Sequence, residues 1–223
     1  MKDHGRSCLR QKAGHLLSAI LMALLAIQLL STAGGCRLWQ KKKAEAVPNI
    51  GSHLRQSSHP IRRVVVLPME SRFAERESAV MLQNSIVESL RQRGAFEVIE
   101  ASQQLLGPCS TTVIADGIYD EQQLVWLMRR FNADAVMYSR LHHARPVAPQ
   151  QMGVICHLVD AREAYVVATV EGAWDLSLPA DKGRFEEYVR INDLNFLDPE
   201  LASHSPRALA AFAGDEIAGE IYR

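Results

Sequence analysis

Hydrophobic and polar positions change period several times along the middle of the chain, and the changes predict strands and helices. Residues 62–68 contain an unbroken β-branched run, which predicts a short strand covered on both faces. Residues 75–93 repeat apolar side chains every three or four positions and stop before Gly94, as an amphipathic helix does. Residues 96–100 alternate like a strand. Together these segments predict a strand-helix-strand unit with a right-handed crossover.

The remainder of the chain predicts a second helix, three further strands and a helical end. We expect a helix over residues 121–131 with Asp120 as its N-cap, and a short helix near residues 103–106. Ser205 followed by Pro206 is typical of the start of a helix, which here reaches Tyr222. The strands are expected over residues 133–141, 153–159 and 165–176, with residues 160–163 as a hairpin connection.

These elements predict one mixed α/β domain over residues 61–223. It is expected to be three-layer-like, with a mixed sheet of about five strands, two or three packing helices and a C-terminal helix. A single core is enough for a domain of this size.

An uncharged apolar run over residues 16–30 predicts the cellular location of the domain. Four basic residues precede the run, and small residues follow it up to Cys36. This is the layout of a secretory signal, so we expect residues 1–35 to be a signal peptide. The four basic residues are Lys2, Arg6, Arg10 and Lys12.

The small residues before Cys36 resemble the lipobox of bacterial lipoproteins, although Ala33 stands where that family usually has leucine. The resemblance implies cleavage between Gly35 and Cys36 and a diacylglycerol on Cys36, which anchors the mature chain to a membrane. One alternative is that residues 16–35 stay uncut and span the bilayer. A soluble secreted product is the third reading, and it leaves Cys36 without a role.

Residues 36–60 are mostly polar or charged, include two prolines, and have no apolar period, so we expect a flexible tether. A tether of about 24 residues has a reach of roughly 25–30 Å. Aspartate after the lipidated cysteine retains such lipoproteins at the inner membrane. Arg37 occupies that place here, which implies sorting to the outer membrane, with an inner-membrane anchor as the alternative.

The charge balance bears on nucleic-acid binding, and the cysteine positions bear on disulfide formation. The chain has 25 basic and 25 acidic residues, and removal of the basic leader leaves a slightly negative remainder, so no nucleic-acid partner is expected. Cys109 and Cys156 remain after the leader and Cys36. Their pairing is left open, since Cys156 lies in an apolar strand-like run where a free thiol packs well.

Chemical motifs are sparse. Gly-x-Ser-x-Gly and phosphate-binding glycine loops are absent, and no catalytic residue, metal ion or cofactor is expected. His142, His143 and His157 lack the spacing of a ligand set. Asp134 and Asp160 are expected to accept backbone hydrogen bonds at strand ends. Glu70, Asp134 and His142 are the only candidates for a pocket beyond the strand ends.

Four segments, residues 64–68, 96–99, 133–136 and 158–161, resemble in their order the periplasmic α/β module of the curli-secretion lipoprotein family. Residues 94–98 and 158–160 match its pieces directly, whereas residues 137–139 lack the glycine that usually follows. The module is shared with the amino-terminal domain of TolB and with lipoproteins that activate peptidoglycan synthases. The likeness covers residues 62–176 and contains no catalytic element.

The sequence therefore favours a lipid-anchored protein on the periplasmic face of the cell envelope. Its domain is expected to be a non-enzymatic module that binds another envelope protein. A small-ligand binder or hydrolase with a cleft at the strand ends is the alternative from a different class. A ring of identical subunits, as the secretion family forms, is the third hypothesis.

Overall fold

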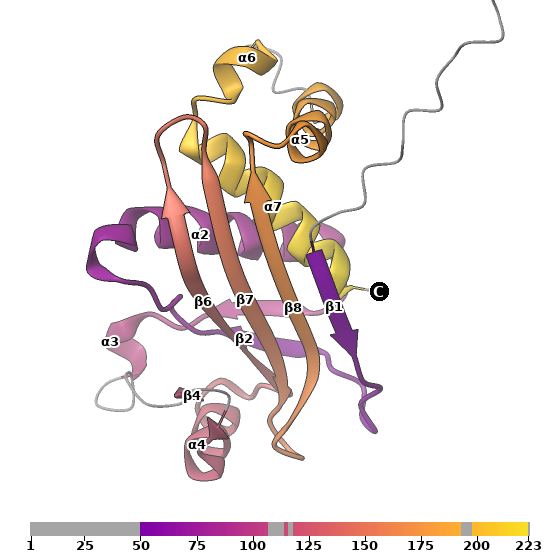
Figure 1. Ribbon diagram of the computed structural model, residues 1–223. Coiled ribbons are helices and arrows are strands. Elements are labelled where there is room, and N and C mark those ends of the chain that lie inside the picture. Colours follow the sequence, from indigo (N-terminus) through magenta and orange to yellow (C-terminus); the bar gives the residue numbers. More distant parts are fainter. Residues whose placement is uncertain (1–49, 107–113, 116–117, 193–197, 223) are drawn as a thin grey trace, which may run out of the picture. The chain divides into compact units, whose positions relative to one another are not determined.

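A computed structural model describes residues 50–106, 114–115, 118–192 and 198–222, which belong to one compact unit over residues 46–223 (Figure 1). The predicted signal peptide, Gly35, Cys36 and residues 37–49 of the tether lie outside the described residues. Within the described residues, the helices are too short or too polar to cross a membrane.

Six strands form the main sheet, and the predicted mixed α/β class is confirmed. The strands, in spatial order, are β1 (Ile50–Leu54), β8 (Tyr165–Asp175), β7 (Gln151–Asp160), β6 (Ala135–Arg145), β2 (Arg63–Val66) and β3 (Glu97–Glu100). The other elements are the 3₁₀ turn η2 (Phe73–Glu75), helices α2 (Arg76–Arg93), α3 (Gln103–Leu106), α4 (Glu121–Phe131), α5 (Pro179–Ile191), α6 (Pro199–Ala202) and α7 (Pro206–Ile221), and the small hairpin of β4 (Ile114–Ala115) and β5 (Ile118–Tyr119).

Strands β3, β2 and β6 run parallel and form the part of the sheet that is covered on both faces. Val64 and Val66 face the core cluster under α2 and α7, and Val65 faces a second cluster that includes Leu124 and Leu127 of α4. The β-branched run therefore behaves as predicted. The connecting helix α2 ends at Gly94, whose φ of 66° is the left-handed conformation that glycine adopts most easily.

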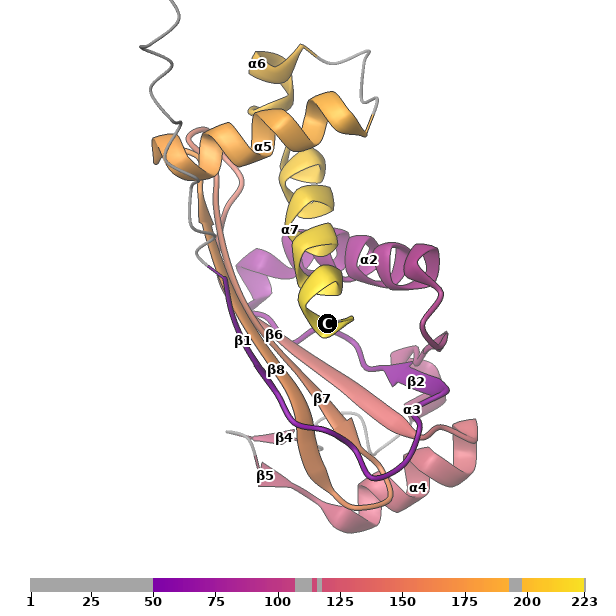
Figure 2. The same ribbon diagram turned by 90° about the vertical axis from the view of Figure 1, so that its right-hand side faces the viewer.

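Strands β6, β7, β8 and β1 are antiparallel, and helices cover one face of them. Buried residues alternate along β7 and β8, and those on the first face join the cluster under α2 and α7. On the second face Glu171 and Ala173 of β8 are exposed, and Figure 2 shows no described helix against this part of the sheet. Antiparallel sheets tolerate one face in water.

Helix α7 crosses α2 closely at Gly214. A Cβ atom built on Gly214 would lie 2.8 Å from the backbone carbon of Ser85, so no side chain fits there without a shift of the helices. Because α2 belongs to the parallel unit and α7 packs on β8, this crossing joins the two parts of the domain.

The structure corrects the predicted boundary between tether and domain. Ile50–Leu54, which we had assigned to the tether, pairs with β8 as the edge strand β1. Only Ile50 is partly buried, so the strand lacks the apolar pattern that would reveal it. It is held by the strand ladder, by a 2.7 Å hydrogen bond from Ser52 to Glu220, and by one of 2.8 Å from Ser57 to Asp160.

Helices α5 and α6 were not predicted, because α5 carries charges on several faces and contains Gly183. A polar network holds it in place. Arg184 bonds Asp181 at 2.8 Å and also contacts Glu216, whose other oxygen accepts the indole N–H of Trp174 at 2.7 Å. Asp181 in turn accepts the backbone N–H of Asp175 at 2.9 Å. The network joins α5 to β8 and α7.

Candidate functional site

Glu70, the first predicted pocket residue, is part of a hydrogen-bonded cluster at the carboxyl end of β2. Its Oε2 accepts from the hydroxyl of Tyr138 at 2.5 Å and from Nε of Arg140 at 2.9 Å. Burial, together with the Glu70 carboxylate, raises the pKa of Tyr138, while the bond to Glu70 raises the pKa of Arg140. Through these two hydrogen bonds, the Glu70 carboxylate holds β6 beside the loop that follows β2.

Asp134, the second predicted residue, lies at the other end of these strands. Its carboxylate accepts from the backbone N–H groups of Arg62 and Arg63 at 3.0 and 3.1 Å, and it bonds Arg162 at 2.8 Å. Burial opposes its ionisation, but these donors outweigh burial and lower its pKa. Asp134 lies six positions before Arg140, the partner of Glu70, which is about 20 Å along the strand between their Cα atoms, so the two acids are at different ends of the sheet.

His142, the third predicted residue, is exposed in an irregularity of the strand pair between Leu141 and His143. It lies near the Glu70 cluster along β6 and far from Asp134. The structure therefore does not bring the three predicted residues together. Within the described part of the chain, no group of three or more His, Cys, Asp or Glu side chains is placed to hold a metal ion.

The expected structural role of the two aspartates is confirmed. Besides Asp134, Asp160 accepts from the backbone N–H groups of Arg162 and Glu163 at 2.8 and 3.1 Å in the β7–β8 turn. Cys156 is buried as a free thiol, and burial raises its pKa to about 12. Cys109 lies outside the described residues.

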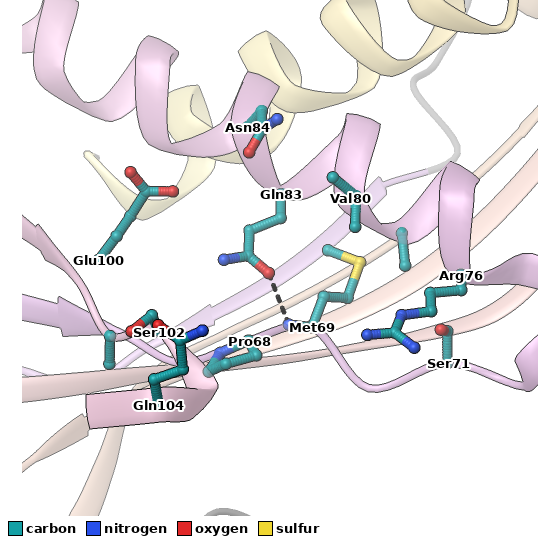
Figure 3. Close-up of a pocket in the computed structure, with 12 residues that line it drawn as sticks. Pro68, Met69, Ser71, Arg76, Val80, Gln83, Asn84, Glu100, Ser102 and Gln104 are labelled. Carbon is teal, nitrogen blue, oxygen red and sulfur yellow. Dashed lines mark hydrogen bonds between the residues drawn. The ribbon is translucent and has the colours of Figure 1, made fainter. Parts of the chain in front are cut away.

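A cavity of about 560 Å³ does lie at the carboxyl ends of β2 and β3, where α/β sheets usually place ligands (Figure 3). The loop after β2 and the first half of α2 form one side, and the start of α3 forms the other. Gln83 of α2 fixes the loop, because its Oε1 accepts the backbone N–H of Met69 at 2.7 Å. Ligand pockets are typically of roughly 300–1,000 Å³, so the size suits a small polar molecule.

The two ends of this cavity differ in charge. Arg76 and Ser71 lie at one end, and Glu100 lies at the other, with the amides of Gln83 and Asn84 between them (Figure 3). Among the described residues, Arg76 has no hydrogen bond or ion-pair partner, whereas Glu100 is 3.4 Å from Arg91. The exposed guanidinium at the start of α2 can therefore bind an anionic group.

Of the three predicted residues, Glu70 and His142 lie toward the end of the sheet that holds the cavity and Asp134 lies at the other end, and the cavity lining includes none of them. Glu70 points to Tyr138, while the neighbouring residues Met69 and Ser71 line the cavity. Arg76 was missed because it was treated as one more charge on an amphipathic helix. Its position in the first turn of the helix that follows the strand was the signal that could have found it.

The uncovered face of the antiparallel strands is the second candidate site. We define it by exposed and half-buried residues in neighbouring registers: Ile155 and His157 of β7, Thr169, Glu171 and Ala173 of β8, and Gly51 and His53 of β1. Burial lowers the pKa of His157. The loop between β6 and β7 joins two inner strands, and the edges of the sheet are β1 and β3.

Comparison with known proteins gives structural likenesses alone. No protein-family model and no curated protein sequence matches the chain. Among solved structures, the PelC dodecamer from Paraburkholderia phytofirmans is similar at 16% identity and a TM-score of 0.42 over 56% of this chain and 80% of that one.

Lipoprotein GNA1162 from Neisseria meningitidis is similar at 15% identity and a TM-score of 0.40, over 61% of this chain and 99% of that one. LpoB from E. coli is similar at 15% identity and a TM-score of 0.36, over 51% of this chain and 57% of that one. Likeness at this level does not establish a shared activity.

Proposed function

We propose that this chain is a lipid-anchored protein of the cell envelope whose domain binds another envelope protein without catalysing a reaction. The observation that carries the proposal is the apolar run that ends in Gly34-Gly35-Cys36 ahead of an ordered domain. The outer membrane is the proposed location, because Arg37 follows Cys36.

Three aspartates with little exposure to water support a non-enzymatic role, because their carboxylates already hold the fold together. Asp134 and Asp160 cap backbone groups, and Asp181 is fully engaged with Arg184 and the backbone of Asp175. Catalytic groups need a free position beside a reacting atom.

We propose the uncovered face as the partner surface. Glycine, alanine and threonine keep much of it flat, while the charged Glu171 and two histidines give it polar contacts. A broad, mixed surface of this kind suits a protein partner, since protein interfaces are about as apolar as ordinary surface.

The ordered strand β1 limits how far the partner can be from the membrane. Thirteen residues separate Cys36 from Ile50, and the fully extended chain between these two residues spans at most about 50 Å. The domain therefore works within a thin layer beside the bilayer, which raises its effective concentration for partners in that layer.

The test combines mass spectrometry with cross-linking in cells. The native product should begin at Cys36 and carry a diacylglycerol, and Cys36→Ala should abolish the modification. A photo-cross-linker at Ala173 should capture a discrete envelope protein, while the same group at Leu105 of α3 should not. An unmodified Cys36 thiol, or equal capture at both positions, would contradict the proposal.

The cavity supports a second candidate function, binding of a small zwitterionic ligand such as an amino acid or dipeptide. The favouring observation is Arg76 opposite Glu100, because Arg76 has no hydrogen-bond or ion-pair partner within the described part of the chain. Thermal-shift titration with free amino acids and dipeptides should then show saturable stabilisation that Arg76→Gln removes and that Arg72→Gln, outside the cavity lining, retains. A flat titration would leave the cavity without a ligand of this class.

A further inference from the structure

Exposed aliphatic side chains gather at one end of the domain. Val147, Ile191 and Leu201 are 70%, 65% and 62% exposed, and they are the three most exposed large hydrophobic residues of the described part. They belong to the β6–β7 loop, the end of α5 and α6, and Leu178 before α5 adds a fourth at 48%. Scattered exposed hydrophobic residues are ordinary, but a group at one end marks a contact surface.

These elements are joined to one another. The backbone N–H of Leu176, just before α5, donates to Gln150 in the β6–β7 loop at 3.0 Å, and α6 packs against α5. Both views show α5 and α6 beside the β6–β7 loop, at the end opposite α4 (Figures 1 and 2). We call this surface the α5–α6 end.

The chain that leads to Cys36 enters the domain close to this end. Ile50 pairs with Gly172, three residues before β8 ends at Asp175, which is a distance of about 10 Å along the strand. Cys36, which would carry the lipid, can be at most about 50 Å from Ile50. Ile50 is therefore nearer to the α5–α6 end of β8 than to the other end of that strand, and the chain before it is long enough for the α5–α6 end to reach the anchored bilayer.

The charges of the α5–α6 end decide what kind of lipid contact is suitable. The described residues 179–191 and 198–202 hold three basic and five acidic side chains, and Lys182 and Arg190 are paired with Glu186 and Glu187. Attraction to anionic headgroups needs a basic surplus. Contact with a bilayer must therefore come from the aliphatic side chains.

We propose that the α5–α6 end rests on the bilayer through Val147, Leu178, Ile191 and Leu201, by apolar contact with the interfacial region and without electrostatic attraction. The inference rests on the proposed membrane anchor. It orients the domain so that α3 and α4 point away from the membrane and the uncovered sheet face stands to the side, open to a partner.

The test uses the membrane-extracted protein in zwitterionic phosphatidylcholine vesicles that contain doxyl-labelled lipid. An environment-sensitive dye is attached in turn to Val147→Cys, Ile191→Cys and Leu201→Cys, and to the control variants Leu105→Cys and Val125→Cys in α3 and α4, all with Cys109→Ser. Doxyl lipid should quench the first three dyes about twofold and leave the controls unchanged, at low and high salt alike.

Each other outcome counts against the proposal. Equal quenching at both ends, or quenching lost at high salt, overturns it. A protein cross-linked at Ile191 or Leu201 without lipid quenching assigns the α5–α6 end to a protein partner instead. Mass spectrometry of the same preparation tests the anchor separately: an unmodified Cys36 refutes the anchor, while the quenching pattern still reports which end faces the bilayer.

Discussion

The parallel strands β3, β2 and β6 and the antiparallel strands β7, β8 and β1 share one sheet but differ in how they exclude water. Helices cover the parallel strands on both faces, whereas one face of β8 and β1 is open. The parallel part is stabilised by burial from two sides. The antiparallel part must be stabilised from one side and from its end, which leaves its other face available for binding.

The end of the antiparallel part is held by charge as well as by packing. Arg184 is 14% exposed at its side chain, bonds Asp181 and Glu216, and lies 5.6 Å from the ring centre of Phe212. The parallel part has no comparable buried ion pair among the described residues, since its pairs, such as Arg63 with Glu97, lie at the surface. The difference predicts where single substitutions will be most harmful.

The largest effect is expected from Arg184→Ala. The substitution removes the shared cation from the buried Asp181 and the partly buried Glu216, and removal of one member of a buried pair costs about 3–5 kcal/mol. Urea unfolding should show a large drop in midpoint. Lys182→Ala, which removes an exposed ion pair on the same helix, should change stability by less than about 1 kcal/mol. Similar losses for the two variants would show that the network does not hold this end.

The next effect tests the junction of the two parts. Gly214→Ala places a Cβ atom against the backbone of α2 and should destabilise the protein by about 1–3 kcal/mol. Gly183→Ala is the matched control, because its Cβ would meet nothing within 4 Å and alanine favours a helix by about 1 kcal/mol over glycine. Differential scanning calorimetry should show a lower melting temperature for Gly214→Ala than for the unchanged protein, and a higher one for Gly183→Ala.

A smaller effect concerns the parallel part and depends on pH. Since the folded state lowers the pKa of Asp134, its ionised form stabilises the fold above the unfolded pKa of about 3.9, and this contribution is lost as pH falls below that value. Asp134→Asn should cost about 1–2 kcal/mol at pH 7 and reduce the loss of stability between about pH 4 and pH 2. An unchanged acid profile in the variant would assign the acid sensitivity to other carboxylates.

The smallest perturbation uses Cys156 to measure opening of the antiparallel part. Burial raises the pKa of this thiol to about 12, so the native protein should resist iodoacetamide at pH 8. The extent of Cys156 alkylation should rise with the fraction of protein that urea unfolds. Prompt alkylation of Cys156 in the native state, located by peptide mass spectrometry, would show that β7 and its neighbours open locally.

The same comparison explains how far sequence reasoning reached. The elements of the parallel part can be recognised in the sequence. Val64, Val65 and Val66 form an apolar run typical of a buried strand, and Gly94 and Asp120 mark helix ends. In the antiparallel part, the lengths of β6 and β7 were underestimated, and β1 and α5 were missed. Strand β1 is held mainly by backbone pairing, and α5 by buried charges, neither of which produces a hydrophobic period.

The candidate site shows the same limit on a smaller scale. Placing a site beyond the strand ends follows from topology, and a cavity is there. The choice of its side chains depends on two facts: Glu70 turns toward Tyr138, and Arg76 has no partner among the residues that the structure describes. Such facts depend on rotamers and on contacts between residues almost 70 positions apart.

The edge position of β1 has a mechanical consequence. Tension on the chain before Ile50 acts first on a five-residue strand whose only neighbouring strand among the described residues is β8, so the backbone bonds of that pair, with the bond from Ser52 to Glu220 of α7, bear the load first. Rupture there would lengthen the connection by several residues while the helices and the remaining five strands stay assembled. Strand β1 can therefore act as an extensible segment between the chain that precedes it and the rest of the domain.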